Sequence, residues 1–483
     1  MIEPETFTGR PGDGNMGGKL RGVKAVRSRM GLPPGPRMPS ALQAVGWAER
    51  PLSFMEQCQK RYGDTFTLRI RHAGVWVFLC DPDDIRRVFT ADAGVLGVGE
   101  ANSLLGPVLG PRSVMLLEEP EHMAHRRRML PSFHGRYMER YGAATGAVAR
   151  EEIAKWPSGE PFALWPRMQD ITLSVIMRAV FGELDTDHLL ELRELLRGLT
   201  EWMNAPLQLT LMAAVGPRSM VRNPTFRTMM DAAEAAVLEE VRKRRAERGS
   251  HERDDIASML EQAHRADGSS LTAQELRDEL ITLLVDGPTS SSLAWAFERL
   301  LRHPDKLARL REEVRGGREE VYMDAVLKET LRLCPPVPIV VRKLLEPMEL
   351  GGYTVPAGAT VAPCAYLLHR SEVLYPEPRS FLPERFLDKP AGTYTWIPFG
   401  GGVRRCLAAS FALLEMKRVI QTVLCEVELR PAQQRSERVA RSSIAFVPDR
   451  HAEAIVVRRL KPSPTGERRA AVAMPQPASV SVG

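Results

Sequence analysis

The stretch of the sequence that decides the fold is Trp396-Ile-Pro-Phe399-Gly400-Gly401-Gly402-Val403-Arg404-Arg405-Cys406-Leu407-Ala408. Its three consecutive glycines allow a tight turn and a close approach of the backbone to a flat ligand. Cys406 directly precedes an amphipathic segment, so the free N–H groups and the dipole of a helix there would favour the thiolate over the thiol. Arg404 is always charged and can bind a carboxylate, and Phe399 can shield the sulfur from water. A lone cysteine is ordinarily an inert buried thiol, but this surrounding loop predicts a functional one.

The composition is that of an ordinary globular chain and excludes several classes of protein. The 483 residues are 44% hydrophobic and 26% charged, which rules out collagen-like, low-complexity and disulfide-rich scaffolds. The net charge of +6 permits an acidic partner without demanding one, and we expect no nucleic-acid partner. The six cysteines are widely spaced and form no Cys-x-x-Cys pair, which indicates reduced thiols and a cytoplasmic location.

The two ends of the chain differ from its middle. Residues 1–31 are polar, glycine-rich and basic, and residues 461–483 are rich in proline, serine and alanine, so we expect both segments to be disordered. They carry net charges of +3 and +2, which leaves only +1 for residues 32–460. The chain contains no run of roughly 18 apolar residues, so we expect no transmembrane anchor.

Hydrophobic periodicity predicts a largely helical chain with short strands near both ends. Segments 65–71 and 75–80 are rich in β-forming residues and flank Gly74, which indicates a hairpin. The helical period dominates the middle of the chain, with one helix beginning at Pro304. The other expected elements are an apolar helix over 271–301 interrupted at 286–288, extended segments at 338–342, 350–354 and 360–364, and a final helix over 407–424. The predicted fold class is therefore mainly α with small β-sheets, in a single composite α+β domain.

The glycine-rich loop resembles the haem-thiolate signature of the cytochrome P450 family, Phe-x-x-Gly-x-Arg-x-Cys-x-Gly/Ala. Every position matches, through Phe399, Gly402, Arg404, Cys406 and Ala408. The resemblance implies the cytochrome P450 fold and haem b (iron protoporphyrin IX) as cofactor, with Cys406 as the axial ligand of the iron. It also implies that Arg404 contacts a haem propionate and that Phe399 packs beside the sulfur. An anionic thiolate donates electron density to the iron and favours O–O cleavage.

A second pattern, upstream of the loop, supports the same resemblance. Glu329-Thr-Leu-Arg332 places a carboxylate and a guanidinium one turn apart on a helix, which alone is most often a surface pair. Pro383-Glu-Arg385-Phe follows it, and the two together resemble the family's Glu-x-x-Arg and Pro-Glu-Arg-Phe motifs. The resemblance implies that Glu329, Arg332 and Arg385 form a buried structural network that braces the haem loop.

Three further residues are expected to contact the haem propionates. His122 and Arg126 lie four residues apart, hence on one face of a helix, and in the family such a pair binds propionates. Arg342 occupies another position from which many relatives contact a propionate. The two arginines that follow Arg126 fit a basic solvated face better. His122 and His125 could suggest a metal site, but their spacing is not that of a His-Glu-x-x-His motif.

The distal helix departs from the family pattern. Relatives carry Ala/Gly-Gly-x-Asp/Glu-Thr there, and the acid and alcohol deliver protons during oxygen activation. This chain reads Val285-Asp286-Gly287-Pro288-Thr289-Ser290, and no register restores the acid–threonine pair. Because Pro288 cannot donate an N–H and opens the turn, we regard Asp286, Thr289 and Ser290 as candidate catalytic residues. Asp286 and Ser290 would share a face of a regular helix. The alternative is that these residues only satisfy backbone groups freed by the kink.

The resemblance implies a monooxygenase that inserts one atom of O2 into an apolar, lipid-, steroid- or terpenoid-like substrate. Electrons would come from NAD(P)H through a reductase and a separate ferredoxin or flavodoxin, and we expect a monomer. The largely aliphatic segments 99–109, 201–212 and 337–341, with the middle of the 271–301 helix, would line the substrate pocket. Two alternatives remain open: a peroxide-driven peroxygenase, and a non-catalytic haem-binding protein.

Overall fold

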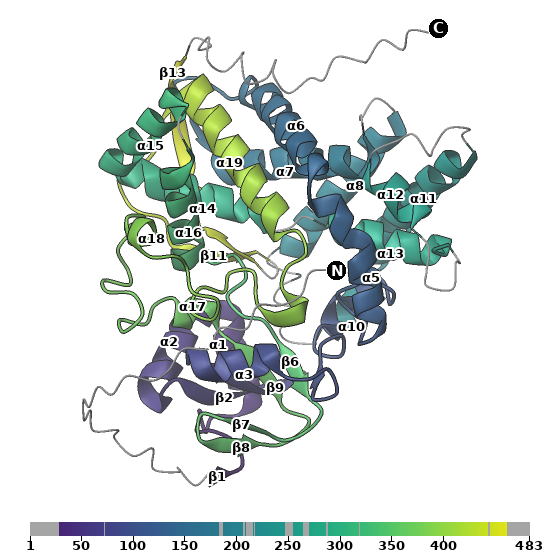
Figure 1. Ribbon diagram of the computed structural model, residues 1–483, viewed down its shortest axis with the longest axis vertical. Coiled ribbons are helices and arrows are strands. Elements are labelled where there is room, and N and C mark those ends of the chain that lie inside the picture. Colours follow the sequence, from purple (N-terminus) through teal and green to yellow (C-terminus); the bar gives the residue numbers. More distant parts are fainter. Residues whose placement is uncertain are drawn as a thin grey trace, which may run out of the picture.

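The computed structural model describes most of the chain (Figure 1). The described residues are 29–71, 73–182, 187–205, 208, 216, 218–246, 255–263, 270–285, 288–317, 319–442 and 445–460. The leader predicted over residues 1–31 and the tail predicted over residues 461–483 therefore lie almost entirely outside the described part of the chain.

Helices make up the larger part of the structure and enclose its main apolar core. α19 (Ala409–Glu426) packs against α6 (Arg136–Ile153), and α14 (Thr289–Arg302) packs against α7 (Leu164–Phe181). The helix after the cysteine loop and the helix after Pro288 are thus both anchored in this core, which occupies the upper part of Figure 1. Among the helices described here, none is long and apolar enough to cross a membrane.

The remaining helices surround this core. α15 (Pro304–Gly316) begins at Pro304, as predicted, because the first turn of a helix does not need the N–H that proline lacks. The others are α1 (Ser40–Glu49), α2 (Pro51–Tyr62), α3 (Pro82–Thr90), α4 (Gly106–Leu109), α5 (Glu121–Met129), α8 (Asp187–Asn204), α10 (Arg218–Arg222), α11 (Pro224–Ala246), α12 (Ile256–Gln262), α13 (Ala273–Leu284), α16 (Val321–Leu333), α17 (Ala365–Leu368), α18 (Arg385–Asp388) and the 3-10 turns η1 (Ser103–Leu105), η2 (Leu130–Phe133) and η4 (Gly402–Arg404).

A five-stranded sheet lies in the lower part of the molecule in Figure 1. Its order is β2 (Thr65–Ile70), β3 (Gly74–Leu79), β9 (Thr360–Pro363), β6 (Arg342–Leu344) and β4 (Leu96–Gly97). β2 and β3 pair antiparallel, so the predicted hairpin is confirmed. The rings of Phe66 and Phe78 stack on one face of it, with centroids 5.1 Å apart. The predicted fold class, mainly α with small sheets, is confirmed.

Three smaller sheets complete the described strands. They are β1 (Arg29–Met30) with β8 (Tyr353–Val355) and β7 (Met348–Leu350); β10 (Val427–Pro431) with β13 (Glu453–Arg459) and β5 (Pro161–Ala163); and β11 (Val439–Ser442) with β12 (Ala445–Pro448). β1 falls inside the segment that we predicted to be disordered. Because Arg29 N–H donates to the carbonyl of Gly352 at 3.1 Å, ordered backbone begins before residue 32, and the prediction was wrong for this end of the leader.

The predicted distal helix is two helices, with the break where the sequence placed the interruption. α13 begins with a capping box between Thr272 and Glu275 and ends at Leu284, after which Val285 is extended. α14 begins after Pro288, which lacks an N–H to continue a helical hydrogen-bond ladder. α13 and α14 are separate helices, and the shared face that a regular helix would give Asp286 and Ser290 stays a prediction. Asp286 itself lies outside the described residues.

Candidate functional site

Backbone hydrogen bonds fold the cysteine loop back on itself. The N–H of Cys406 donates to the carbonyl of Phe399 at 2.9 Å, which closes the loop at its base. Inside it, the N–H of Arg405 donates to the carbonyl of Gly402 at 3.1 Å. The Phe399 ring lies 6.1 Å from the Trp396 ring in an edge-to-face arrangement. Cys406 is thereby held three residues before α19, on a loop with little freedom to change shape.

The glycines of the loop are required by a neighbouring helix. A Cβ atom at Gly401 would lie 2.2 Å from the ring of Phe89, at the end of α3. A Cβ atom at Gly402 would lie 2.1 Å from the carbonyl oxygen of Phe89, and Gly402 has a φ of +68°. The sequence suggested that the glycines permit close approach to a ligand. The structure shows that Gly401 and Gly402 permit close approach of α3, which fixes the loop against the rest of the fold; their approach to a ligand stays a prediction.

The thiol of Cys406 is accessible although many protein atoms surround it. Burial is the largest influence on its pKa and raises it above the ordinary value. The N–H of Ala408 and the guanidinium groups of Arg126 and Arg405 act in the opposite direction. The thiolate predicted from the helix terminus is therefore not favoured by the protein alone. A metal cation at the sulfur would reverse this, since a coordinating thiol is deprotonated.

Arg404 points from the loop toward the segment that precedes α5. Its guanidinium donates to the carbonyl of Leu117 at 2.8 Å and lies 3.6 Å from Glu118 and 3.5 Å from Glu119. Nδ1 of His122 lies 2.6 Å from the carboxylate of Glu119. Burial lowers the pKa of His122 below its ordinary value, and the positive charge of Arg404 lowers it further. Two of the predicted propionate-binding residues thus share one carboxylate, and His122 is favoured in its neutral form.

Arg342 is a buried cation that forms no direct ion pair within the described part of the chain, although the charge of Glu118 acts on it. It is 6% exposed, and its guanidinium donates to the carbonyl of the adjacent Val341 at 2.7 Å. Burial and the nearby charge of Arg404 lower its pKa to about 10. Burial also lowers the pKa of Arg126. A buried charge without a partner is costly, so these arginines fit a ligand that brings its own carboxylates.

The predicted donor set therefore fits haem. Arg126, Arg342 and Arg404 supply more positive charge than the neighbouring glutamates neutralise, which suits the two propionates. Cys406 supplies one accessible sulfur for the iron. Among the residues described, no group of three or more His, Cys, Asp or Glu side chains could hold a separate metal ion.

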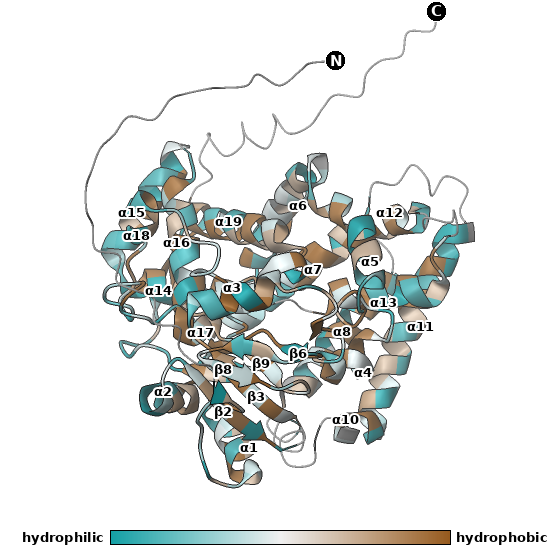
Figure 2. Ribbon diagram, turned by 60° about the horizontal axis from the view of Figure 1, so that its bottom comes forward, coloured by the Kyte–Doolittle hydropathy of each residue, from teal (hydrophilic) through white to brown (hydrophobic). Residues whose placement is uncertain are grey.

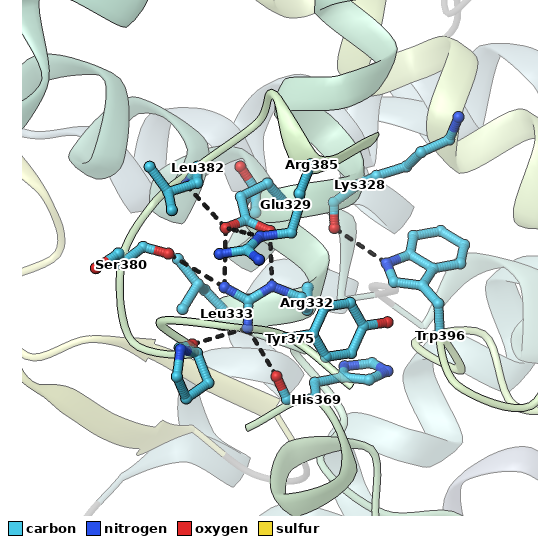
Figure 3. Close-up of polar contacts among 12 residues, drawn as sticks. Lys328, Glu329, Arg332, Leu333, His369, Tyr375, Ser380, Leu382, Arg385 and Trp396 are labelled. Carbon is cyan, nitrogen blue, oxygen red and sulfur yellow. Dashed lines mark hydrogen bonds and ion pairs between the residues drawn. The ribbon is translucent and has the colours of Figure 1, made fainter. Parts of the chain in front are cut away.

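Glu329, Arg332 and Arg385 lie together, as Figure 3 shows. Both carboxylate oxygens of Glu329 accept from Arg332, at 2.6 and 2.8 Å, and Oε1 also accepts from Nε of Arg385 at 3.2 Å. The N–H of Leu382 donates to the same oxygen at 2.8 Å. The side chains of Glu329 and Arg332 are fully buried. Since each hydrogen-bonding partner is itself held by the fold, the three residues form a rigid polar core.

This polar core is connected directly to the start of the cysteine loop. Arg332 donates to the carbonyl of His369 at 2.7 Å, and Nε2 of His369 accepts the N–H of Ile397 at 2.9 Å. Nε1 of Trp396 donates to the carbonyl of Lys328 at 3.0 Å, on the same helix as Glu329. Figure 3 shows Trp396 and His369 flanking the network. We did not identify His369 from the sequence, because no spacing rule marks a buried histidine that caps a distant backbone N–H.

The distal residues are only partly brought together. Thr289 is the first residue of α14 and is partly buried, and Ser290 beside it is buried. The hydroxyl and the N–H of Ser292 both donate to the carbonyl of Pro288, each at 3.1 Å, so this serine fastens the first turn of α14. The candidate role of Asp286 falls on a residue outside the described ranges.

Charged residues on α13 were also missed by the sequence analysis. Oε1 of Glu279 lies 2.5 Å from Nδ1 of His125, which sits between His122 and Arg126 on α5. We had considered His125 only as a metal ligand. The signal that could have found the pair is a run of charges, Arg277-Asp278-Glu279, inside an otherwise apolar helix.

Comparison with known proteins places these observations in a family. The family model described as Cytochrome P450 matches residues 30–451. A Mycobacterium tuberculosis protein described as cytochrome P450 135B1 is 40% identical over 435 residues, which are 88% of this chain and 91% of that protein. Another from the same organism, described as cytochrome P450 137, is 35% identical over 87% of this chain and 90% of that protein.

Solved structures show the same fold. Retinoic acid bound cyanobacterial CYP120A1 matches with a TM-score of 0.77 at 21% identity, over 89% of this chain and all of that one. The cytochrome P450DA heme domain matches with a TM-score of 0.74 at 22% identity, over 90% of this chain and 99% of that one. At these identities the likeness concerns the arrangement of helices and sheets.

Proposed function

The chain belongs to the cytochrome P450 family of haem-dependent monooxygenases, and we propose that this member oxidises an apolar, lipid-, steroid- or terpenoid-like substrate. Bound haem supplies the iron at which O2 is activated, so that one oxygen atom enters the substrate. The observation that carries the assignment is an accessible Cys406 on a braced loop, together with Arg342, a buried guanidinium that forms no ion pair within the described residues.

Each residue of the site has a distinct part in this proposal. Cys406 holds the iron from one side, and Arg126, Arg342 and Arg404, with His122, hold the two propionates. A hydrogen bond to a charged group contributes roughly 1.5–3 kcal/mol, so together these contacts retain a cofactor that is not covalently attached. Phe399, at the base of the same loop, would limit access of water to the sulfur. Gly402 lets the loop seat against α3.

The apolar substrate is supported by a cluster of side chains at the predicted pocket. Val108 and Leu109 from α4 pack with Leu199 of α8 and with Phe226 and Met230 of α11. The rings of Trp202 on α8 and Phe226 on α11 also lie close together, with centroids 5.5 Å apart. These side chains offer dispersion contacts and no charge, which favours a ligand with extensive hydrocarbon surface. Two of the segments predicted to line the pocket contribute to this cluster, which we name the wall cluster.

We further propose that an acidic ferredoxin or flavodoxin, reduced by an NAD(P)H reductase, docks over the cysteine loop. Val403 is 58% exposed on the loop, and Arg405 beside it is exposed. The charge of Arg405 acts on Arg126, so the two guanidiniums lie close together, and Arg127 next to Arg126 is exposed. This small positive surface around an apolar residue suits an acidic electron donor. The six unpaired cysteines support a cytoplasmic location, and we expect a monomer.

One observation favours peroxide as a second oxidant. α13 ends at Leu284 and α14 begins at Thr289, and no register of the sequence around them restores the acid–threonine pair. Peroxide already carries the two electrons that a redox partner would supply and the protons that this pair would help to deliver, so a chain without the pair could use it.

Two measurements test the proposed function. A screen of lipids, steroids and terpenoids for a substrate-induced spin shift identifies the substrate class, and we expect aliphatic ligands to bind and polar ones of equal size not to bind. Turnover of the best ligand is then compared with O2 plus a ferredoxin system and with peroxide alone. Product in the first assay supports the monooxygenase, and product only in the second supports the peroxygenase. Product in neither, across the whole panel, would overturn both.

A further inference from the structure

Three consecutive charged residues of α13 are buried, which is rare on a helix. Arg277, Asp278 and Glu279 are 4%, 0% and 1% exposed. Successive helical side chains project about 100° apart, so three neighbours cannot face one partner. Burying a charge is costly unless it is paired and hydrogen-bonded. Each of these residues must therefore reach a different neighbouring element, and the contacts show that it does.

Arg277 joins α13 to α11. Its Nη2 donates to Oε2 of Glu234 at 2.9 Å, and its Nη1 donates to Oδ1 of Asp278 at 2.8 Å. α13 packs against both α11 and α4, and the three helices lie on the same side of the molecule in Figure 2. The guanidinium thus bridges a carboxylate on α11 and a carboxylate on its own helix.

Asp278 joins α13 to the segment that follows α4. Its Oδ2 accepts the N–H of Arg112 at 2.8 Å. The backbone approaches so closely that a Cβ atom at Gly110, where φ is +84°, would lie 2.2 Å from Oδ1. One turn farther along α13, the hydroxyl of Thr282 donates to that of Ser113 at 2.7 Å. The segment after α4 is therefore seated on α13 by two side chains and a glycine.

Glu279 holds the next stretch of the same segment. Its Oε2 accepts the N–H of Val114 at 3.4 Å, and its Oε1 contacts His125 of α5. Asp278 therefore binds the residues next to α4, whereas Glu279 binds the residues that follow them and α5.

Arg277 and Asp278 join α4 and α11, two of the elements that contribute side chains to the wall cluster. We call these two elements its walls. Val108 and Leu109 directly precede Gly110, and Met230 lies one turn before Glu234 on α11. The polar chain runs from Glu234 through Arg277 and Asp278 to the N–H of Arg112. It therefore ties together the bases of two walls whose apolar side chains face each other.

We propose that Arg277 and Asp278 are positioning residues that fix the separation of the α4 and α11 walls and so set the affinity for bulky apolar ligands. The proposal rests on the proposed function in one respect, namely that the wall cluster receives the substrate. Neither residue touches the haem-binding side chains described above. Weakening this series of polar contacts should lower the affinity for ligands that contact both walls and leave the affinity for small iron ligands unchanged.

The test is a pair of optical titrations on the haem-loaded, full-length protein. Imidazole is small and binds iron without needing the walls, whereas clotrimazole carries three phenyl rings and needs them. The variant Asp278→Asn replaces one acceptor oxygen by an NH2 group, so a donor faces either Arg277 or the N–H of Arg112. The variant Glu234→Gln removes only the charge at the far end of the chain. Glu298→Gln is the matched control, because Glu298 is a buried helical glutamate on α14 that binds Glu437 N–H.

We expect Asp278→Asn to raise the Kd of clotrimazole about tenfold, equivalent to about 1.4 kcal/mol, while the Kd of imidazole changes less than about twofold. Glu234→Gln should also raise the ratio of the clotrimazole Kd to the imidazole Kd, by a smaller factor. The control variant should leave this ratio unchanged. Hydrogen exchange of residues 110–114 should also be faster in Asp278→Asn. Equal ratios in wild type and both variants, or an equal change in the control, would overturn the proposal.

The outcomes separate this proposal from the proposed function. If Asp278→Asn does not fold, the milder Glu234→Gln decides, because its side chain is partly exposed. Both azoles bind iron without turnover, so the ratio of Kd values can be measured even if no substrate is oxidised. Failure of turnover with an altered ratio would overturn the proposed activity alone. An unchanged ratio with normal turnover would overturn the positioning role alone.

Discussion

Glu329 and Arg332 form a bidentate ion pair, at 2.6 and 2.8 Å, in which neither side chain is exposed to solvent. Arg332 also donates to the carbonyl of His369, whose ring accepts the N–H of Ile397. The ion pair is therefore connected through His369 to the backbone segment that leads into the cysteine loop. Its position explains how a structural pair on α16 can determine where a sulfur atom on a distant loop lies.

Removing one charge of this pair should destabilise the protein strongly. Glu329→Gln leaves Arg332 and Arg385 buried with too little negative charge, and breaking a buried pair costs about 3–5 kcal/mol. Urea unfolding measures this loss of free energy of unfolding. Glu346→Gln, at an exposed glutamate, is the control and should change it by less than about 0.5 kcal/mol. A loss below about 1 kcal/mol in Glu329→Gln would contradict the role assigned to the network.

The stability of the protein should fall in mild acid because of His369. Burial, with Arg332 and Arg370 nearby, holds the pKa of His369 well below its ordinary value of 6.5. The unfolded chain therefore binds a proton below about pH 6.5 that the folded protein does not bind. Stability is fully present above that pH and is lost as the pH falls toward the folded-state pKa, by up to about 1.4 kcal/mol per pH unit.

The variant His369→Gln tests this assignment, because glutamine can accept the Ile397 N–H but does not titrate. Between pH 6.5 and 5, its free energy of unfolding should depend less on pH than that of wild type. The difference in slope corresponds to about one proton fewer taken up on unfolding. Chemical unfolding at a series of pH values gives both curves. Parallel curves would show that His369 does not titrate on unfolding.

Replacing Arg342 should weaken haem retention without weakening the apoprotein. Arg342 is buried and has no ion pair within the described residues, so Arg342→Met removes a costly buried charge from the haem-free protein. The holoprotein loses one charge-assisted contact of roughly 1.5–3 kcal/mol, which speeds haem transfer to apomyoglobin about tenfold or more. Arg404→Met is the contrast, since it leaves Glu118 and Glu119 without their guanidinium partner. An apoprotein with Arg342→Met that melts well below wild type would contradict the assignment.

The two glycines that contact Phe89 should respond differently to compensation. Gly401→Ala inserts a methyl group 2.2 Å from the Phe89 ring, and such overpacking costs about 1–3 kcal/mol. Phe89→Leu should remove much of that cost, because the conflict is with a side chain. Gly402→Ala conflicts with the backbone carbonyl of Phe89 and should not be rescued. Thermal unfolding of the single and double variants gives the comparison, and equal rescue of both would contradict the structure.

Local patterns in the sequence predicted the elements that depend on near neighbours. The β2–β3 hairpin follows from alternation around Gly74, and the start of α15 follows from Pro304. The meeting of Glu329 with Arg385 could be predicted only through the family resemblance, because nothing local in either motif indicates that the two helices adjoin. The order of the two motifs along the chain, compared with the family pattern, indicated this contact.

The features that were missed depend on contacts between distant parts of the chain. No local signal indicates that Gly401 must accommodate Phe89, or that Arg277 finds Glu234 on another helix. The thiolate prediction for Cys406 counted the helix terminus and omitted burial, which raises the pKa of the thiol in the protein without a cation. Local rules describe donors and dipoles well, but they do not describe desolvation.

The central claim is that Cys406 binds the haem iron as a thiolate, and the carbon monoxide difference spectrum of the reduced protein tests it most directly. We predict the band typical of thiolate-ligated haem in wild type and in Cys425→Ala, which replaces the other exposed cysteine. We predict its loss in Cys406→Ala, with haem content measured separately. A thiolate-type band that survives in Cys406→Ala, or its absence from haem-loaded wild type, would contradict the account.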